Sequence, residues 1–276
     1  MLLLIYPFTH LPLYPYTYLT LVWLCLAKKY FSGEVMTQLK YKRMLLKISG
    51  EGFCAANGFG LDGRALETIA AQIGDLRKMG VEPAVVVGAG NFVRGSALSQ
   101  QTNVHRVTAD QIGMLATVIN AIALQDVLES QGSPTRVMSA IDVAAICEPF
   151  IRRRAIKHLE NGRVIVLAAG TGNPFFTTDT CAALRAAEIQ AEVLVKATKV
   201  DGVYSADPVQ EPSAELYQRL SYGDVIQQKL KVMDHSAISL CQENGIDIVV
   251  CNLMKHGQVA RVALGEAIGT LITKAE

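Results

Sequence analysis

The fold class is decided by one stretch, Ala168-Ala169-Gly170-Thr171-Gly172-Asn173-Pro174-Phe175-Phe176-Thr177-Thr178-Asp179. Before it, the apolar run 164–167 is typical of a buried parallel strand. After it, residues 180–187 predict a helix. A strand, a turn of small residues and a helix in this order present a ligand crevice in an α/β sheet. The backbone N–H groups of such a turn favour an anion, although its GTGN portion alone would also fit an ordinary strand-to-helix turn.

The same alternation of apolar runs and amphipathic helices continues in both directions. Strands alternating with helices predict a mostly parallel sheet with helices on both faces, which is an α/β fold. No composition break suggests a linker after residue 40. We expect strands at 43–48, 84–87, 135–138, 163–167, 192–196, 247–250 and 269–273. We expect helices near 66–79, 108–130, 150–160, 234–244 and 258–264, a short helix starting at 221, and a polar, hairpin-like excursion over 199–208.

Several helix starts carry capping signals. Asp62 precedes an apolar stripe and fits an N-cap. Thr108 with Gln111, and Ser221 with Asp224, have the capping-box spacing. We therefore expect a long helix to begin at Thr108 and a short one at Ser221.

Composition narrows the function classes. The chain has 276 residues, half of them hydrophobic, and a net charge of +1. This balance argues against a broad nucleic-acid or membrane patch, but not against a small anion site. The six cysteines show no CxxC pair and no metal spacing, and most read as small core residues in a reducing compartment; they are Cys25, Cys54, Cys147, Cys181, Cys241 and Cys251.

The N-terminal segment differs from the rest. Residues 1–27 contain no Lys, Arg, Asp or Glu, so the basic start of a secretory signal is missing. Pro7, Pro12 and Pro15 interrupt the roughly 20 apolar residues that a membrane helix needs. We expect residues 1–40 to be a poorly ordered extension outside the fold, with Met36 as a plausible natural start and residues 41–276 as one domain of two lobes.

Two lysines occupy equivalent places. Lys47 and Lys196 each lie at the end of an apolar strand, beside a turn rich in glycine or threonine. A single lysine there usually extends its stem to solvent, but two of them suit phosphoryl transfer, which needs compact cations on the phosphates. Asp179, in the first turn of its helix, would lie between them and orient them. The alternative is an aspartate that only complements the helix dipole.

A second glycine-rich loop spans residues 88–95. It reads GxGxxxxG, so it lacks the GxGxxG dinucleotide fingerprint. Its glycines allow close approach of a phosphate, and Arg94 could hold one or be a surface arginine. Asp110 could hold a ribose hydroxyl or only complement a helix dipole. The run 152–154 fits a solvated helix face, and we assign no role to a histidine.

The ordered motifs from about Tyr41 to Lys274 resemble the bacterial UMP kinases of the amino acid kinase family. The matching stretches are Lys47-Ile48-Ser49-Gly50-Glu51, Gly58-Phe59-Gly60, Gly90-Asn91 with Arg94-Gly95, Asp110 with Gly113-Met114-Leu115-Ala116-Thr117, Met138-Ser139-Ala140-Ile141, Thr171 to Asp179, Lys196-Ala197-Thr198-Lys199-Val200-Asp201-Gly202-Val203-Tyr204, Ala206-Asp207-Pro208, Lys231-Val232-Met233-Asp234 and Gly269-Thr270-Leu271-Ile272.

The resemblance implies a three-layer α/β/α sandwich, the amino acid kinase fold, with an acceptor lobe followed by an ATP lobe. It implies a cytoplasmic homohexamer in pyrimidine nucleotide biosynthesis, without a nucleic-acid or membrane partner. The reaction would transfer the γ-phosphate of ATP, bound with Mg²⁺, to UMP. GTP would activate the enzyme and UTP would inhibit it.

Residue roles carry over by position. Lys47, Lys196, Asp179, Asp201 and Arg94 would be catalytic, with the two aspartates organising the lysines and the metal, and no residue is assigned as a direct metal ligand. ATP would be bound by Lys47, Ser49, Gly50, Gly90, Arg94, Lys196, Thr198, Tyr204 and Asp207. UMP would be bound by Ala89, Asp110, Thr171, Gly172, Asn173, Pro174, Phe175, Phe176, Thr177 and Thr178. The GTP effector region would comprise Ala55, Ala56, Asn57, Gly58, Phe59, Gly60 and Arg136.

The chain also departs from the family pattern. Ala89 replaces a glycine that is often found there, which matters little if only its N–H is used. Residues 55–57 differ from the common effector loop, so the regulatory inference is weaker than the catalytic one. Three rival functions remain. The first is another kinase of the superfamily, which would act on a carboxylate, a carbamate or isopentenyl phosphate. The second is a non-catalytic sensor of UTP or GTP, and the third is a dehydrogenase. Asp110 and residues 171–178 disfavour the first, the intact lysines disfavour the second, and the missing fingerprint disfavours the third.

Overall fold

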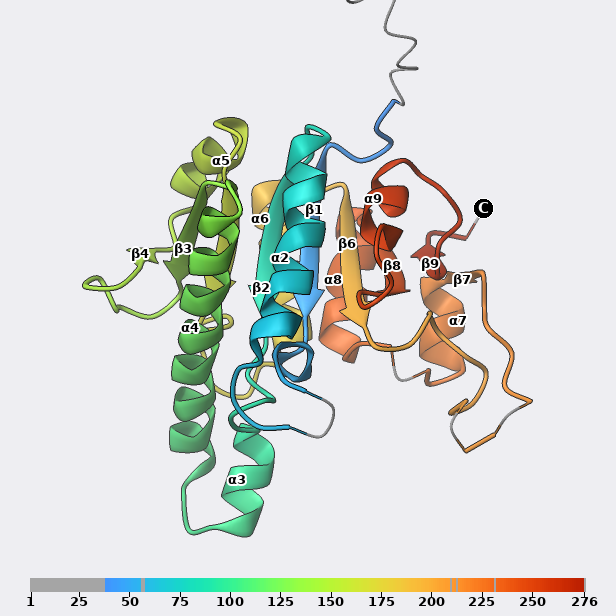
Figure 1. Cartoon of the computed structure of the whole chain (residues 1–276). Coiled ribbons are helices and arrows are strands. Elements are labelled where there is room, and N and C mark those ends of the chain that lie inside the picture. The colour runs from blue at the N-terminus through green and yellow to red at the C-terminus, as the bar shows by residue number, and fades with distance from the viewer. Residues whose placement is uncertain (1–37, 56–57, 209, 212, 231, 276) are drawn as a thin grey trace, which may run out of the picture. The chain divides into compact units, whose positions relative to one another are not determined.

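The computed structural model describes residues 38–55, 58–208, 210–211, 213–230 and 232–275. Most of the expected N-terminal extension, with Met36, lies outside these residues. From Leu39 onward the chain forms one compact unit (Figure 1). Its strands are β1 (Arg43–Ile48), β2 (Glu82–Val87), β3 (Thr135–Ser139), β4 (Glu148–Pro149), β5 (Val164–Ala168), β6 (Val193–Thr198), β7 (Arg219–Ser221), β8 (Asp247–Asn252) and β9 (Thr270–Thr273). Its helices are η1 (Gly50–Phe53), α2 (Gly63–Lys78), α3 (Gly95–Gln101), α4 (Arg106–Ser130), α5 (Arg152–Glu160), α6 (Thr178–Ile189), α7 (Tyr222–Gln227), α8 (His235–Asn244) and α9 (Gln258–Ala263).

The described strands form one sheet in the order β4-β3-β5-β2-β1-β6-β8-β9-β7. Every pair from β4 to β8 is parallel, whereas β9 runs antiparallel to β8 and β7 runs parallel to β9. The mostly parallel α/β sheet is therefore confirmed. Strands β2 to β5 lie on one side of β1 and strands β6 to β9 lie on the other, so the order reverses at the β1–β6 pair. Open α/β sheets bind ligands at such a reversal, outside the carboxyl ends of the strands.

Strand alternation divides the core into two clusters. Met44, Leu46 and Ile48 of β1 belong to the cluster that α2, α4 and α9 cover. Leu45 belongs to the opposite cluster, which α5, α6 and α8 cover (Figure 1). Because successive strand side chains point to opposite faces, Lys47 lies on the face of Leu45, which is the face of α6. Each fully buried aliphatic side chain stabilises this arrangement by about 1.5–3 kcal/mol.

Most helix-end predictions are confirmed, and one is wrong. The Asp62 side chain accepts from Ala65 N, and Ser221 with Asp224 forms a capping box. The long helix, however, begins at Arg106, two residues before Thr108, and its N-cap residue His105 makes no side-chain cap. The N–H of Ala109 instead bonds the carbonyl of His105. The contacts of α3 with α4 hold this first turn in place despite the local capping pattern at Thr108.

Three short elements were not predicted. Helix α3 has no buried residue and so gives no apolar stripe, while β4 and β7 are only two and three residues long. An antiparallel bridge between Tyr204 and Leu216 gives this region a hairpin-like form, but its second arm lies beyond the predicted end at Pro208. Arg152 to Arg154 are exposed on α5, as predicted.

Two apolar features of the described chain belong to the core. Helix α4 is long and apolar enough to cross a membrane by length and composition alone. Its residues Val118, Ala121, Leu124 and Leu128 nevertheless pack in the cluster beneath the sheet. The five described cysteines are unpaired and buried, which confirms the prediction that they are core residues.

Candidate active site

The two strand-end lysines meet at a single carboxylate. Lys47 on β1 is paired in register with Lys196 on β6. The Nζ of Lys47 lies 2.7 Å from Oδ1 of Asp179, and the Nζ of Lys196 lies 3.0 Å from Oδ2. The Nζ of Lys196 also donates to the carbonyl of Val232. The structure therefore contains the predicted contact of Asp179 with both lysines.

Burial and charge shift the ionisation of this group of three. Burial alone would raise the pKa of the Asp179 carboxyl, but the charges of Lys47 and Lys196 outweigh it and hold the pKa below its ordinary value of 3.8. Burial lowers the pKa of the Lys196 amino group below 10.5, and Asp179 opposes this shift. A mostly buried site with two cations and one anion is suited to an anionic ligand.

The N-terminus of α6 places Asp179 between the lysines. Thr177 is the N-cap, and its Oγ1 accepts from the N–H groups of Asp179 and Thr180. The hydroxyls of Thr177 and Thr180 both donate to the carboxylate of Asp234. Asp234 also caps α8 by accepting from Ala237 N at 2.8 Å. One carboxylate thus joins the first turns of two helices at the site.

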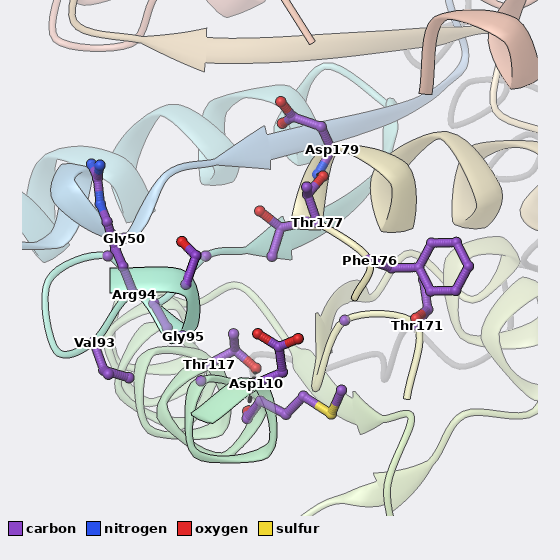
Figure 2. A pocket seen from close by; sticks show the side chains of 18 of the residues that line it. Gly50, Val93, Arg94, Gly95, Asp110, Thr117, Thr171, Phe176, Thr177 and Asp179 are labelled. Atoms are coloured by element: carbon purple, nitrogen blue, oxygen red, sulfur yellow. Dashed lines mark hydrogen bonds between the residues drawn. The ribbon is translucent and has the colours of Figure 1, made fainter. Parts of the chain in front are cut away.

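A cavity of about 480 Å³ opens at the carboxyl ends of β1, β2 and β5. Figure 2 shows it with Asp179 and Thr177 on one side and Asp110 and Thr117 on another. We call it the acceptor cavity, because most of the residues expected to bind UMP line it. Its lining comprises Lys47, Ser49, Gly50, Gly88, Ala89, Gly90, Val93, Arg94, Gly95, Ser96, Arg106, Asp110, Gly113, Met114, Thr117, Gly170, Thr171, Asn173, Phe176, Thr177, Thr178 and Asp179.

The two glycine-rich loops pack backbone against backbone beside this cavity. A Cβ atom on Gly50 would lie 2.2 Å from the nitrogen of Gly90, so only glycine fits there. Ala89 is not among the described residues with a left-handed φ, which is consistent with an alanine in place of glycine. The loops keep their N–H groups close to the cavity, as an anion site requires.

A buried amide pair supports the same loop. Asn91 and Asn120 exchange two side-chain hydrogen bonds of 2.9 and 2.8 Å. Asn120 Nδ2 also donates to the carbonyl of Gly88, and Asn91 Nδ2 donates to that of Gly60, both at 2.7 Å. The pair therefore fixes the loop after β2 on α4.

Charged side chains stand around the mouth of the cavity. Arg94 forms an ion pair with Glu51, and about half or more of each side chain is exposed. Arg106 Nε donates to both carboxylate oxygens of Asp110 at 2.9 Å, and the N–H of Phe175 donates to Asp110 Oδ2 at 2.8 Å. Asp110 thus links α4 to the segment after β5.

A second cavity, of about 600 Å³, lies on the other side of Lys196. We call it the donor cavity, because four residues expected to serve ATP line it: Lys196, Thr198, Tyr204 and Asp207. Residues without a predicted role line it as well: Val200, Gly202, Val203, Ser205, Ala206, Pro208, Gln210, Gln228, Lys229, Leu230, Val232 and Val250. The Lys47–Asp179–Lys196 group stands between the two cavities, since Lys47 and Asp179 line one and Lys196 lines the other.

Asp201 lies apart from the two lysines. Its Oδ1 accepts from Asn252 Nδ2 at 3.1 Å and is 2.7 Å from Lys255 Nζ. These hydrogen bonds, that of Lys255 above all, lower the pKa of the Asp201 carboxyl below 3.8. The predicted arrangement in which Asp201 organises the two lysines is not the one that the structure shows.

The residues of the predicted effector region are divided between two places. The ring of Phe59 packs edge-on against Phe92 with centroids 5.6 Å apart, and Gly60 N donates to Asn91 O. Ala56 and Asn57 lie outside the described residues. Arg136, by contrast, lies on β3, three strands from β1, and bonds to Glu129, Thr135 and Glu148. Only the loop at 58–60 adjoins the glycine-rich loop of the acceptor cavity.

The described residues contain no group of three or more His, Cys, Asp or Glu side chains that could hold a metal ion. Magnesium is commonly bound through one or two carboxylates together with the phosphates of the substrate. The carboxylates predicted to organise such a metal are Asp179, which lines the acceptor cavity, and Asp201.

Two charged residues of the site were not identified from the sequence. Asp234 belongs to a stretch that carries the family resemblance but was assigned no role, and its contacts with Thr177 and Thr180 span more than 50 residues of chain. Arg106 carried one unused signal, a cation at the start of a helix, where the dipole disfavours it. The contact of Thr117 Oγ1 with Ala169 N, at 2.7 Å, was also missed.

Known proteins are similar to this chain in sequence and in fold. A family model for the amino acid kinase family matches residues 42–252. A uridylate kinase from Methylococcus capsulatus is 52% identical over 237 residues, which cover 86% of this chain and 99% of that protein. The crystal structure of a UMP kinase from Bacillus anthracis has a TM-score of 0.82 at 38% identity, covering 86% of this chain and 97% of its own. That of a UMP kinase from Ureaplasma parvum has a TM-score of 0.79 at 34% identity, covering 86% and 100%. The chain belongs to the amino acid kinase family and, within it, to the UMP kinases.

Proposed function

We propose that this chain transfers the γ-phosphate of ATP to UMP and forms UDP. The observation that carries the proposal is the Lys47–Asp179–Lys196 group, which stands where the acceptor cavity meets the donor cavity. ATP would enter the donor cavity with its base near Tyr204 and Asp207, and UMP would enter the acceptor cavity beside Asp110. The transferred phosphoryl group would then pass between the two lysines.

The lysines have the properties that this transfer requires. Charge spreads over the oxygens of the transferred group, and compact cations stabilise it. Asp179 uses one oxygen for each lysine, so it fixes both ammonium groups relative to each other. Because both lysine side chains are mostly buried, water screens their attraction for phosphate less than it would at the surface.

The reaction needs no general base. A phosphate monoester has its second pKa near 6, so most of the UMP is a dianion at pH 7. Its own oxygen is the nucleophile, and the main obstacle is repulsion between two anions. Lys47, Lys196 and Arg94 would screen this repulsion and hold the groups in line. When bound with ATP, Mg²⁺ supplies further neutralisation of the β- and γ-phosphates.

Further properties of the proposed enzyme are its regulation by nucleotides, its self-association and its place in the cell. Contacts of Phe59 and Gly60 with residues 91–92 support an effector loop that reaches the acceptor cavity. Ile112, Leu115 and Ile119 form an exposed apolar stripe on α4, which supports self-association to the expected homohexamer. We further propose GTP activation, UTP inhibition and a cytoplasmic role in pyrimidine nucleotide biosynthesis.

A substrate panel tests the reaction. ADP release from MgATP would be followed with UMP, CMP, dTMP, acetylglutamate and aspartate, using the full chain. We expect turnover with UMP and little with the other acceptors. Turnover with another acceptor would identify a different kinase, and tight UTP or GTP binding without any turnover would identify a nucleotide sensor.

A matched pair of variants tests the assigned chemistry. Lys47→Met should lower kcat by about two orders of magnitude or more, because it removes a preorganised charge from the transition state. The control is Lys42→Met, five residues earlier, where an exposed side chain pairs only loosely with Glu82 at 3.6 Å. Near-normal turnover of Lys47→Met would remove Lys47 from the mechanism.

A further inference from the structure

Arg106 occupies a position that helix physics disfavours. It is the first residue of the 25-residue helix α4, whose first turn contains no acidic residue and whose N-cap makes no side-chain bond. The N-terminus of a helix carries partial positive charge, so a cation there is destabilising. Residues that break a local rule tend to lie at functional sites. Arg106 also lines the acceptor cavity.

The contact that Arg106 makes there is with Asp110, one helical turn along. Its Nε donates to Oδ1 and to Oδ2, both at 2.9 Å. The Asp110 side chain is only 13% exposed, whereas that of Arg106 is 42% exposed and covers it. The N–H shared by both oxygens fixes the direction of the carboxylate, and the N–H of Phe175, which donates to Oδ2 alone, fixes the rotation of its plane.

Arg106 also contacts the segment on the far side of Asp110. Its guanidinium carbon lies 5.4 Å from the ring centroid of Phe175, within cation–π range. Phe175 has a left-handed backbone with φ of 72°, which is unusual for a bulky residue and persists only where its surroundings hold it. Its N–H donates to Asp110 Oδ2. Arg106 therefore holds both Asp110 and the residue that bonds to it.

These bonds leave Asp110 with one open direction. A carboxylate offers about four lone-pair sites; Arg106 uses one on each oxygen, and Phe175 uses the second on Oδ2. The remaining site is on Oδ1. Gly95 passes next to this oxygen, and a Cβ atom there would lie 2.5 Å from it, so a glycine keeps that oxygen uncrowded.

We propose that Arg106 is a positioning residue that sets the sugar selectivity of the acceptor cavity. By fixing Asp110 it directs the open acceptor site on Oδ1 at one ribose hydroxyl of the acceptor nucleotide. The proposal rests on the function proposed above, in which Asp110 receives a ribose hydroxyl. Arg106 itself touches neither the phosphate nor the sugar.

The test compares kcat/KM for UMP with kcat/KM for 2′-deoxy-UMP and 3′-deoxy-UMP. The larger of the two ratios measures how strongly the cavity selects its hydroxyl. Arg106→Gln should lower that ratio about tenfold or more, since it removes a bond that orients a charged acceptor. The ratio should fall because kcat/KM for UMP falls, while kcat/KM for the deoxynucleotide that lacks the selected hydroxyl changes little. Arg106→Lys should give an intermediate ratio, because an ammonium lacks the planar fork. Arg64→Gln, an exposed arginine at the start of α2, should leave the ratio unchanged.

Each alternative gives a distinct result. If Arg106 bound the acceptor phosphate, kcat/KM would fall equally for all three substrates and the ratio would stay constant, which would overturn the proposal. An unchanged ratio in a folded Arg106→Lys variant would do the same. In the double variant with Asp110→Asn, Arg106→Gln should lower the ratio no further than Asp110→Asn alone. Failure of the wild type to use UMP would refute the proposed function itself and is read independently of the variants.

Discussion

Asp179→Asn is the substitution that tests the site most directly, because it removes one charge from a buried group of three while keeping the shape of the side chain. The asparagine keeps an oxygen for one lysine, but it cannot neutralise either ammonium group. Lys47 and Lys196, with side chains only 10% and 19% exposed, would then face each other across adjacent strands without a counter-charge.

The expected loss of stability follows from this burial. Removing one partner of a buried ion pair costs about 3–5 kcal/mol. Lys196 keeps its hydrogen bond to the Val232 carbonyl, so we expect the lower end of the range, about 3 kcal/mol. For a domain of this size that corresponds to a fall in Tm of roughly 6–12 °C. Turnover should fall by about two orders of magnitude as well, because both lysines lose their fixed positions.

The pH dependence adds a second signature. The folded-state pKa of Asp179 is below 3.8, so its contribution to stability is complete above that pH and is lost as the pH falls through the folded-state value. The Tm difference between the wild type and Asp179→Asn should therefore be constant near neutral pH and shrink below pH 3.8.

Calorimetry and urea unfolding would measure both effects, with Asp75→Asn as the control. Asp75 pairs with Lys78 at 3.2 Å, but its side chain is 38% exposed, and such surface pairs contribute about 0–1 kcal/mol. If Asp179→Asn lowered Tm no more than Asp75→Asn did, the claim that Asp179 stabilises two buried charges would be refuted.

Two further substitutions test the loops of the acceptor cavity. Asn120→Ala should destabilise the fold by about 2–3 kcal/mol and raise KM for UMP, because it leaves Asn91 and the Gly88 carbonyl without their buried partner. Urea unfolding would measure the loss of stability, and steady-state kinetics would measure KM. If the free-energy losses of Asn91→Ala and Asn120→Ala simply added in the double variant, the two amides would act independently and the reasoning would be contradicted. Glu51→Gln should change stability by less than about 1 kcal/mol, since its pair with Arg94 is largely exposed. It should lower KM for ATP, whose phosphates Arg94 is predicted to hold, because Arg94 no longer has to leave Glu51 in order to bind a phosphate, and a raised KM for ATP would contradict this.

The positions of the two strand-end lysines could be predicted because their placement depends on local rules. A residue at the end of a short apolar strand lies at the carboxyl edge of a parallel sheet, and alternation fixes its face. Lys47 and Lys196 satisfy both conditions, and the helix that begins beside Asp179 follows from the turn before it. Each of these steps uses fewer than a dozen residues of sequence.

The contacts of Asp234 and Arg106 could not be predicted in the same way. Asp234 caps α8 as its pattern suggests, yet its bonds to Thr177 and Thr180 depend on how α6 and α8 pack. The capping pattern at Thr108 predicts a start two residues later than the observed start of α4 at Arg106, because no local signal marks His105 as the N-cap. Short elements such as α3 were missed because they bury nothing and so leave no periodic signal.

The same packing makes the two cavities depend on each other. Thr177, beside the acceptor cavity, is bonded to Asp234, and the carbonyl of Val232, two residues earlier, is bonded to Lys196 at the donor cavity. Asp179 contacts both Lys196 and Lys47, and its own N–H donates to Thr177. Polar contacts therefore connect residues of the two cavities through Asp179. An acceptor that orders the turn at Thr177 therefore also fixes Asp179 and the 232–234 segment. Because Lys47 and Lys196 already converge on Asp179, a ligand that contacts the turn at Thr177 would lie next to groups that also face the donor cavity.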